Sequence, residues 1–119
     1  MQQEDFDSII VALQSPRIAI KDRYSSYIWA NEEFLKDSGL ESCEQILWLS
    51  DYDLPWVNQA GQLIKEDQDI LCGRAVNVTS VHTIEVSHKN QNSIAMIKYP
   101  ITSNEGIIIG VICLYWIDN

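Results

Sequence analysis

The sequence predicts a single α+β domain built on a five-stranded antiparallel sheet. Helical and strand patterns come in blocks: one helix, two strands, several short helices and three strands. The chain has 119 residues, of which 46% are hydrophobic, which suits one domain with a real core. Helices placed between a strand pair and a three-strand meander are typical of α+β domains. We expect the short helices on one sheet face and the first helix as a cap.

The first predicted element is a helix over residues 4–14, followed by the domain core over residues 15–118. The apolar residues of this helix recur at helical spacing: Phe6, Ile9, Ile10 and Leu13. Pro16 ends this helix because proline disfavours a helical residue before it. So short a helix is marginal in isolation. We therefore expect its apolar stripe to form a homodimer interface together with the exposed sheet face; the alternative is that the helix folds back on the sheet of its own chain.

Two strands and a capped helix come next. The strands are predicted over 17–22 and 26–31, on either side of a polar turn. Asn31 is a good N-cap for a helix over 32–38. Gly39 can take the left-handed conformation that ends a helix.

A second short helix is predicted over 43–47. Ser42 and Gln45 have the spacing of a capping box, in which each side chain satisfies a free backbone N–H group.

The stretch DYDLPW, residues 51–56, is either an acidic site or the start of a longer helix. Proline suits the first helical position, so Pro55 predicts a helix over about 55–72, ended by Gly73. Asp51 or Asp53 would then cap that helix. A hard cation would need several more oxygen ligands nearby. We interpret the two aspartates as caps and expect no metal.

Three strands complete the chain, over 75–87, 93–101 and 107–118. In the first of them, Val76, Val78, His82, Ile84 and Val86 share one face by alternation. The apolar run 107–117 is about half of the roughly 20 residues that a membrane-spanning helix needs. Its β-branched and aromatic content predicts a buried strand and no membrane insertion.

Charge and cysteine content narrow the function classes. The net charge of −9 disfavours direct binding to nucleic acid, because phosphates repel an acidic surface. Cys43, Cys72 and Cys113 are too widely spaced for a metal motif or a disulfide framework. His82 and His88 would lie too far apart along one strand to share a metal. We expect a cytoplasmic protein with reduced cysteines.

The order of elements and several short motifs resemble the signal-sensing subclass of PAS domains found in bacterial signalling proteins. The motifs are K-D, N-x-x-F-x-x-x-x-G, D-x-D-L, D-x-x-(apolar)-x-x-G, K-x-P and G-x-(apolar)-x-G. They fall on Lys21, Asp22, Asn31, Phe34, Gly39, Asp51, Asp53, Leu54, Asp69, Gly73, Lys98, Pro100, Gly106 and Gly110. The resemblance implies a sensory module that dimerises and controls an attached kinase, cyclase or helix-turn-helix regulator. The chain would then be a fragment of a larger signalling protein.

The resemblance also places a ligand pocket between the sheet and the long helix. Strand alternation and that location give these lining candidates: Ile64, His82, Ile84, Met96, Tyr99, Cys113 and Tyr115. No haem is expected, because the long helix has no histidine, and no flavin, because the cysteine motif of flavin photosensors is absent. A small organic ligand and a ligand-free interaction module both remain open. A small stand-alone enzyme with an acid/base carboxylate is the third hypothesis, and we expect no catalytic residues.

Overall fold

A five-stranded antiparallel sheet forms the centre of the computed structural model, which describes residues 16–86 and 91–118. The strands lie in the order β2-β1-β5-β4-β3, so the last strand in sequence is the central one. The elements in chain order are β1 (Arg17–Asp22), β2 (Tyr27–Ala30), α2 (Glu32–Ser38), α3 (Cys43–Ile46), α4 (Ala60–Leu71), β3 (Val78–Glu85), β4 (Gln91–Thr102) and β5 (Ile108–Asp118). The predicted fold class is confirmed.

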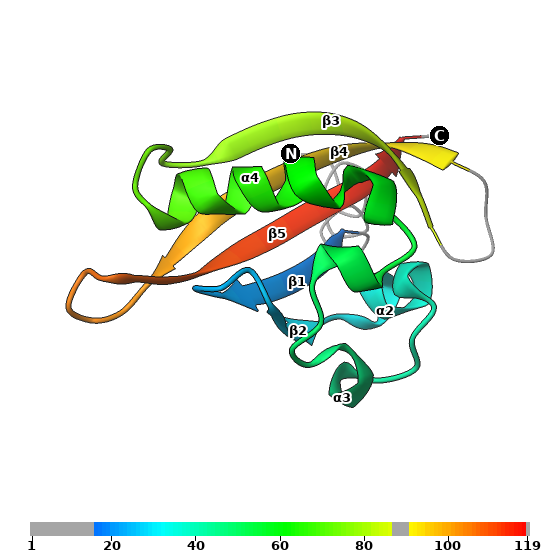
Figure 1. Cartoon of the computed structure of the whole chain (residues 1–119), viewed down its shortest axis with the longest axis horizontal. Coiled ribbons are helices and arrows are strands. Elements are labelled where there is room, and N and C mark those ends of the chain that lie inside the picture. Colours follow the sequence, from blue (N-terminus) through cyan, green and yellow to red (C-terminus); the bar gives the residue numbers. More distant parts are fainter. Residues whose placement is uncertain (1–15, 87–90, 119) are drawn as a thin grey trace, which may run out of the picture.

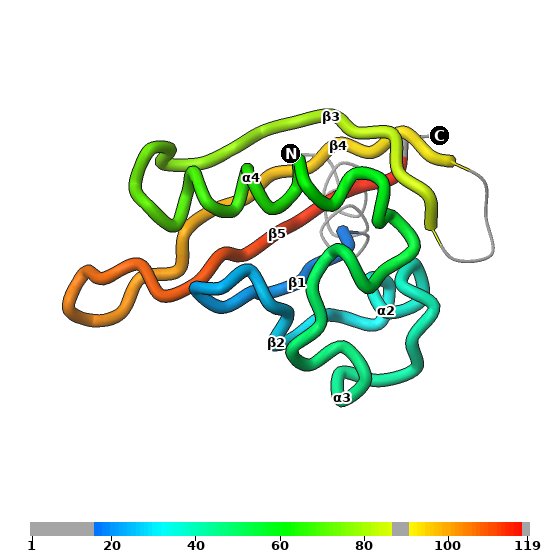
Figure 2. Tube along the Cα trace, in the orientation of Figure 1, coloured from blue at the N-terminus to red at the C-terminus, as the bar shows by residue number. Residues whose placement is uncertain are grey.

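The helices lie on one face of the sheet (Figure 1). Helix α4 runs across β4 and β5, whereas α2 and α3 lie beside β1 and β2 (Figure 2). The hydrophobic core lies between these helices and the sheet. Its most deeply buried members include Ala19, Phe34, Ile46, Trp56, Ile84, Ile94 and Tyr115. The predicted helix over 4–14 lies outside the described residues.

Strand β5 is the apolar run predicted to be a buried strand. It pairs with β1 on one side and with β4 on the other. Within residues 16–86 and 91–118, no helix is long and apolar enough to cross a membrane.

Local signals set both ends of α2 as predicted. Asn31 Oδ1 accepts a hydrogen bond from the backbone N–H of Phe34 at 3.0 Å. The same oxygen accepts from the N–H of Ile18 at 3.1 Å, which ties the start of α2 to β1. Gly39 follows the helix with φ 76°, the left-handed conformation that favours glycine. One side chain therefore both caps the helix and places it on the sheet.

The predicted start of the long helix at Pro55 is wrong, because α4 begins at Ala60. Residues 51–53 and 57–59 form separate 3₁₀ turns. Leu54 between them is extended, with φ −112° and ψ 167°. A residue before proline is pushed towards extended conformations, so the chain leaves the helical region here. The predicted end is correct: α4 stops at Leu71 and Gly73 has φ 79°.

The predicted capping box of the second short helix does not form. The Ser42 side chain makes no capping hydrogen bond to α3. Gln45 Oε1 instead accepts from the backbone N–H of Glu41 at 2.6 Å. The glutamine thus accepts from the residue before Ser42, whereas the capping-box pattern predicts a bond from the N–H group of Ser42 itself.

Replacing Gly110 with alanine is expected to destabilise the sheet. A Cβ at Gly110 would stand 2.5 Å from the backbone oxygen of Lys21 on the neighbouring strand. Because that atom is backbone, β1 or β5 would have to shift, at a cost of about 2 kcal/mol in the free energy of unfolding. Urea unfolding measures the change. Gly61→Ala in α4 is the control, since its nearest atom would be 3.6 Å away and alanine favours helix. Equal effects of the two substitutions would contradict this account.

Candidate functional site

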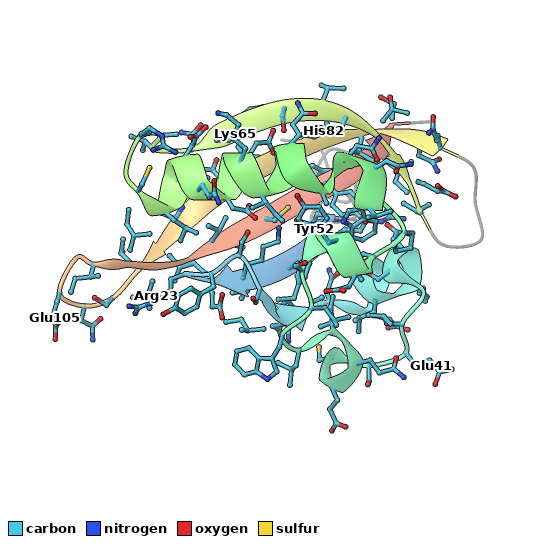
Figure 3. All side chains as sticks on the ribbon, viewed as in Figure 1. Arg23, Glu41, Tyr52, Lys65, His82 and Glu105 are labelled. Carbon is cyan, nitrogen blue, oxygen red and sulfur yellow. The ribbon has the colours of Figure 1, made fainter. Side chains whose placement is uncertain are left out.

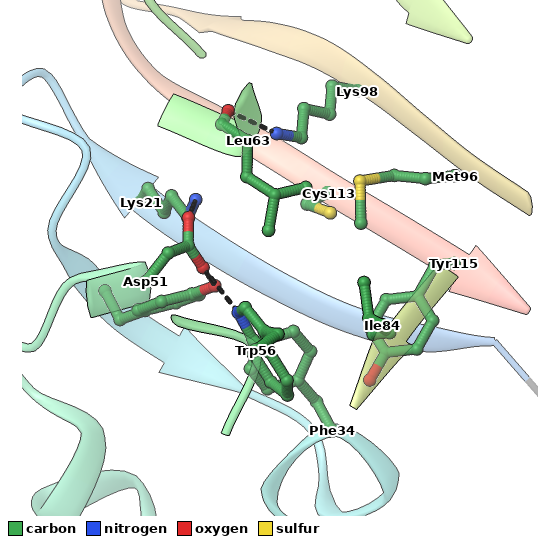
Figure 4. Close-up of a pocket in the computed structure, with 11 residues that line it drawn as sticks. Lys21, Phe34, Asp51, Trp56, Leu63, Ile84, Met96, Lys98, Cys113 and Tyr115 are labelled. Atoms are coloured by element: carbon green, nitrogen blue, oxygen red, sulfur yellow. Dashed lines mark hydrogen bonds and ion pairs between the residues drawn. The ribbon is translucent and has the colours of Figure 1, made fainter. Parts of the chain in front are cut away.

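A small cavity lies between α4 and the inner face of the sheet (Figure 4). All five strands contribute to its wall, together with α2, α4 and the loop that joins α3 to α4. The lining residues are Lys21, Tyr27, Phe34, Asp51, Trp56, Leu63, Ile84, Met96, Lys98, Cys113 and Tyr115. The free volume is about 10 Å³, which is room for about one water molecule. Side chains therefore fill most of the space that a ligand would need.

Lys21 forms one side of the polar end of the cavity. Its side chain is 2% exposed, and its Nζ lies 2.6 Å from Asp51 Oδ2 and 2.7 Å from Asp67 Oδ2. The hydroxyl of Ser25 also donates to Asp67 Oδ2. A buried ammonium group is tolerated only when it is paired and hydrogen-bonded in this way. The two carboxylates provide that pairing.

Lys98 enters the same network from β4. Its Nζ donates to the backbone oxygen of Leu63 at 2.9 Å. It also forms ion pairs with Asp67 Oδ1 at 2.8 Å and with Glu66 Oε1 at 3.3 Å. Asp67 therefore bridges a lysine of β1 and a lysine of β4, on either side of the central strand β5. This bridge attaches α4 to the sheet.

The electrostatics of the network stabilise its charged forms. Burial alone would raise the pKa of Asp67, but Lys21 and Lys98 outweigh it and lower that pKa. Burial alone would lower the pKa of Lys21, but Asp51 and Asp67 outweigh it and raise that pKa. Cys113 differs, since burial raises the pKa of its thiol to about 11. The thiol is therefore protonated and unreactive at neutral pH.

Aromatic side chains adjoin Asp51 in the cavity wall. Phe34 lies 5.3 Å from Tyr27, 5.4 Å from Trp56 and 5.7 Å from Tyr115, measured between ring centroids. Asp51 Oδ1 accepts from the Tyr27 hydroxyl and, at 2.8 Å, from Trp56 Nε1. Two of the rings are thus fixed by hydrogen bonds as well as by packing.

Four of the predicted pocket residues lie together in this wall. They are Ile84, Met96, Cys113 and Tyr115. Two others, Ile64 and His82, are not among the lining residues. His82 is buried on β3, with its Nε2 3.0 Å from Glu66 Oε2 of α4 (Figure 3).

The placement of Tyr99 in the pocket is wrong. Met96 and Lys98 line the cavity, so strand alternation puts Tyr99 on the opposite face, where it is 43% exposed.

The two aspartates of DYDLPW have different roles, and neither caps α4. Asp53 Oδ2 accepts from the backbone N–H of Ser50 at 2.9 Å and completes a capping box around the first 3₁₀ turn. Asp51 is 1% exposed and pairs with Lys21. Among the described residues, no group of three or more His, Cys, Asp or Glu could hold a metal ion.

Both lysines and Asp51 were missed as pocket residues, although all three occupy motif positions of the PAS resemblance. A signal for the lysines was present. Each lysine comes two residues after a buried residue of the same strand, so alternation points it to the same buried face. Lys21 comes two residues after Ala19, and Lys98 comes two residues after Met96. A lysine at such a position must find a buried partner, and sequence spacing could not identify Asp67 as that partner.

Comparisons with known proteins support the fold. No protein-family model and no curated protein matches the chain. Among solved structures, a PAS domain from Colwellia psychrerythraea matches at TM-score 0.70 and 14% identity, covering 87% of this chain and 86% of the other. The chain has the PAS fold. VqmA bound to DPO matches at TM-score 0.81 and 17% identity over 95% of this chain.

The Vibrio cholerae VqmA dimer without target DNA is another structure with this PAS fold. It matches at TM-score 0.81 and 17% identity over 100% of this chain. This chain covers 57% of the DPO-bound VqmA chain and 52% of the chain in that dimer, so it spans about half of their length.

Asp51→Ala is expected to destabilise the PAS domain far more than Asp53→Ala. Removing Asp51 leaves the buried Lys21 with one carboxylate fewer, and breaking a buried pair costs about 3–5 kcal/mol. Removing Asp53 loses one exposed cap, which costs about 1 kcal/mol. Thermal and urea unfolding compare the two variants. Similar losses in both would show that the buried pair has no special role.

Proposed function

We propose that this chain is a cytoplasmic sensory module that binds a small organic molecule in the cavity beneath α4. It acts without haem or flavin, and it controls an output domain attached to it in a longer protein. The main support for this proposal is the cavity itself, which has apolar and aromatic walls and a few convergent polar groups. Small-molecule sites usually have walls of this composition. A ligand bound to VqmA, a protein with the same fold, supports this choice.

The contacts of α4 suggest how binding would be relayed. Leu63 contributes its side chain to the cavity wall, and its backbone oxygen accepts from Lys98. A ligand that displaces the Leu63 side chain would strain this hydrogen bond and the Asp67 bridge one turn further along α4. The position of α4 on the sheet would then report whether the cavity is occupied.

A ligand-free interaction module is the second candidate. The small free volume favours it, because a closed core filled by side chains needs no ligand. The enzyme hypothesis lacks comparable support. It calls for a buried carboxylate with a raised pKa, whereas Lys21 and Lys98 lower the pKa of Asp67, and the hydrogen bond to His82 and the charge of Lys98 lower the pKa of Glu66.

Native mass spectrometry of the purified domain, followed by calorimetric titration with DPO, separates the two candidates. We expect a co-purified small molecule, saturable DPO binding, or both. Lys98→Met should weaken the binding at least about tenfold, because it removes the hydrogen bond to the Leu63 carbonyl and the ion pair with Asp67, which hold α4 over the cavity. Lys65→Met is the matched control, since Lys65 is exposed on α4 (Figure 3). A domain that carries no small molecule and does not bind DPO would favour the ligand-free module.

The outer face of the sheet supports a further part of the proposal, a homodimer. Cross-strand registers place apolar side chains in rows on this face, opposite the helices. One row consists of Tyr99, Ile112, Ile20 and Trp29, another of Ile97, Leu114 and Ile18, and a third of Val81, Ala95 and Trp116. A continuous apolar surface of this kind is typical of an interface. A second copy is the proposed occupant, because VqmA of this fold forms a dimer.

The N-terminal stripe of Phe6, Ile9, Ile10 and Leu13, outside the described residues, is the proposed second half of that interface. The double substitution Ile9→Asp with Leu13→Asp should shift the sedimentation of the chain from dimer to monomer, because it buries charge in an apolar contact. Ser8→Asp with Ser15→Asp adds the same charge off the stripe and should leave the dimer intact. A monomeric wild type at tens of micromolar would refute the dimer. A dimer unaffected by either pair would place the interface elsewhere.

A further inference from the structure

The charged groups in the cavity wall are saturated by partners within the protein. The three charged lining residues are Lys21, Asp51 and Lys98. Lys21 Nζ donates to Asp51 Oδ2 and Asp67 Oδ2, and it lies 4.8 Å from the centroid of the Tyr27 ring, within cation–π distance. An ammonium group has three donors and no acceptor. Each donor of Lys21 therefore has a partner in the protein.

Asp51 is saturated in the same way, and Lys98 is paired through one hydrogen bond and two ion-pair contacts. Lys98 Nζ contacts three oxygens, the Leu63 carbonyl and the carboxylates of Asp67 and Glu66. Asp51 accepts from Tyr27, Trp56 and Lys21. Asp51 in the lining and Asp67 behind it balance the charges of the two lysines. Glu66, outside the lining, has a second partner in His82.

The rest of the wall is uncharged. It consists of apolar and aromatic side chains and the protonated thiol of Cys113. A carboxylate or an ammonium group entering this space would find no free counter-ion, and it would have to break an existing buried pair to gain one. Both outcomes are costly.

We propose that the cavity accepts only small uncharged ligands and rejects carboxylates and ammonium ions. This inference rests on the proposed function, since it names the ligand class of the same site. Asp67 is the positioning residue of this selectivity: it contacts both lysines without lining the cavity. Its charge keeps the two lysines occupied.

Met96 is the side chain that makes room for such a ligand. It projects from β4 towards Cys113 and the centre of the cavity (Figure 4). It is 6% exposed, unbranched and flexible, whereas the aromatic rings and the lysines around it are fixed by their contacts. Truncating a buried apolar side chain leaves a cavity that can bind small aromatic molecules. Met96→Ala therefore provides a binding-competent cavity even when the natural ligand is unknown.

Calorimetry on the Met96→Ala chain at pH 7 tests the proposal with three probes of similar size: benzyl alcohol, benzoate and benzylammonium. Benzyl alcohol should bind saturably and raise the melting temperature, with no such effect on the wild type. The two ions should bind roughly 100-fold more weakly or not at all, because each buries an unpaired charge. Benzoate or benzylammonium binding as tightly as benzyl alcohol would overturn the proposal, and so would failure of all three to bind. Met96→Val, a smaller truncation, replaces Met96→Ala if that variant does not fold.

Asp67→Asn in the Met96→Ala background tests the cause of the selectivity. Losing one carboxylate leaves the two lysines short of a counter-ion, so benzoate binding should appear or strengthen at least about tenfold. Asp69→Asn removes the same charge from the part of α4 that contacts Lys65 and Arg74, and it should leave benzoate excluded. No gain of benzoate binding in a folded Asp67→Asn chain would refute the role of Asp67. Failure to find a natural ligand for the wild type would affect the proposed function only, since these probes report on the cavity directly.

Discussion

The Asp67 carboxylate, held between two lysines of different strands, is the interaction on which the arrangement of this domain depends. Its Oδ2 lies 2.7 Å from Lys21 Nζ on β1, and its Oδ1 lies 2.8 Å from Lys98 Nζ on β4. Strand β5 runs between these two strands. A single helical side chain therefore spans three strands and sets where α4 lies on the sheet.

This network contributes more to position than to net stability. Desolvating two ammonium groups and two carboxylates costs nearly as much as their pairing returns, and apolar residues of similar volume could stabilise the core equally well. Removing one member of the network lowers the stability strongly, because it leaves an uncompensated buried charge. The penalty for breaking the network, more than its net energy, holds α4 in one place. The fixed position of α4 also determines the shape of the cavity beneath it, since Leu63 of α4 forms part of the wall.

The two faces of the sheet therefore have different characters. The inner face holds buried charges, a small cavity and an interlocked set of aromatic rings. The outer face presents uncharged rows of isoleucine, leucine and aromatic side chains. Because adjacent strand residues point to opposite faces, the cavity wall and the outer rows belong to the same strands. This arrangement would connect the proposed sensory cavity directly to the proposed dimer interface on the far side.

Features that depend on neighbours a few residues apart could be predicted from the amino-acid sequence. Alternation located the strands, Asn31 and Gly39 located α2, and Gly73 located the end of α4. Motif order indicated the PAS fold. The sequence patterns did not identify most of the pocket wall, and they did not distinguish Asp51 as a buried partner from Asp53 as a cap.

Those points became visible in the folded chain, because they depend on contacts between residues far apart in the sequence. Lys21 and Asp67 are separated by 46 positions, and Lys21 and Asp51 by 30. A buried charge must be paired, so a lysine predicted to be buried implies that an acidic partner exists. Which carboxylate fills that role is set by where the helix packs, and packing brings together residues whose sequence positions bear no periodic relation to one another.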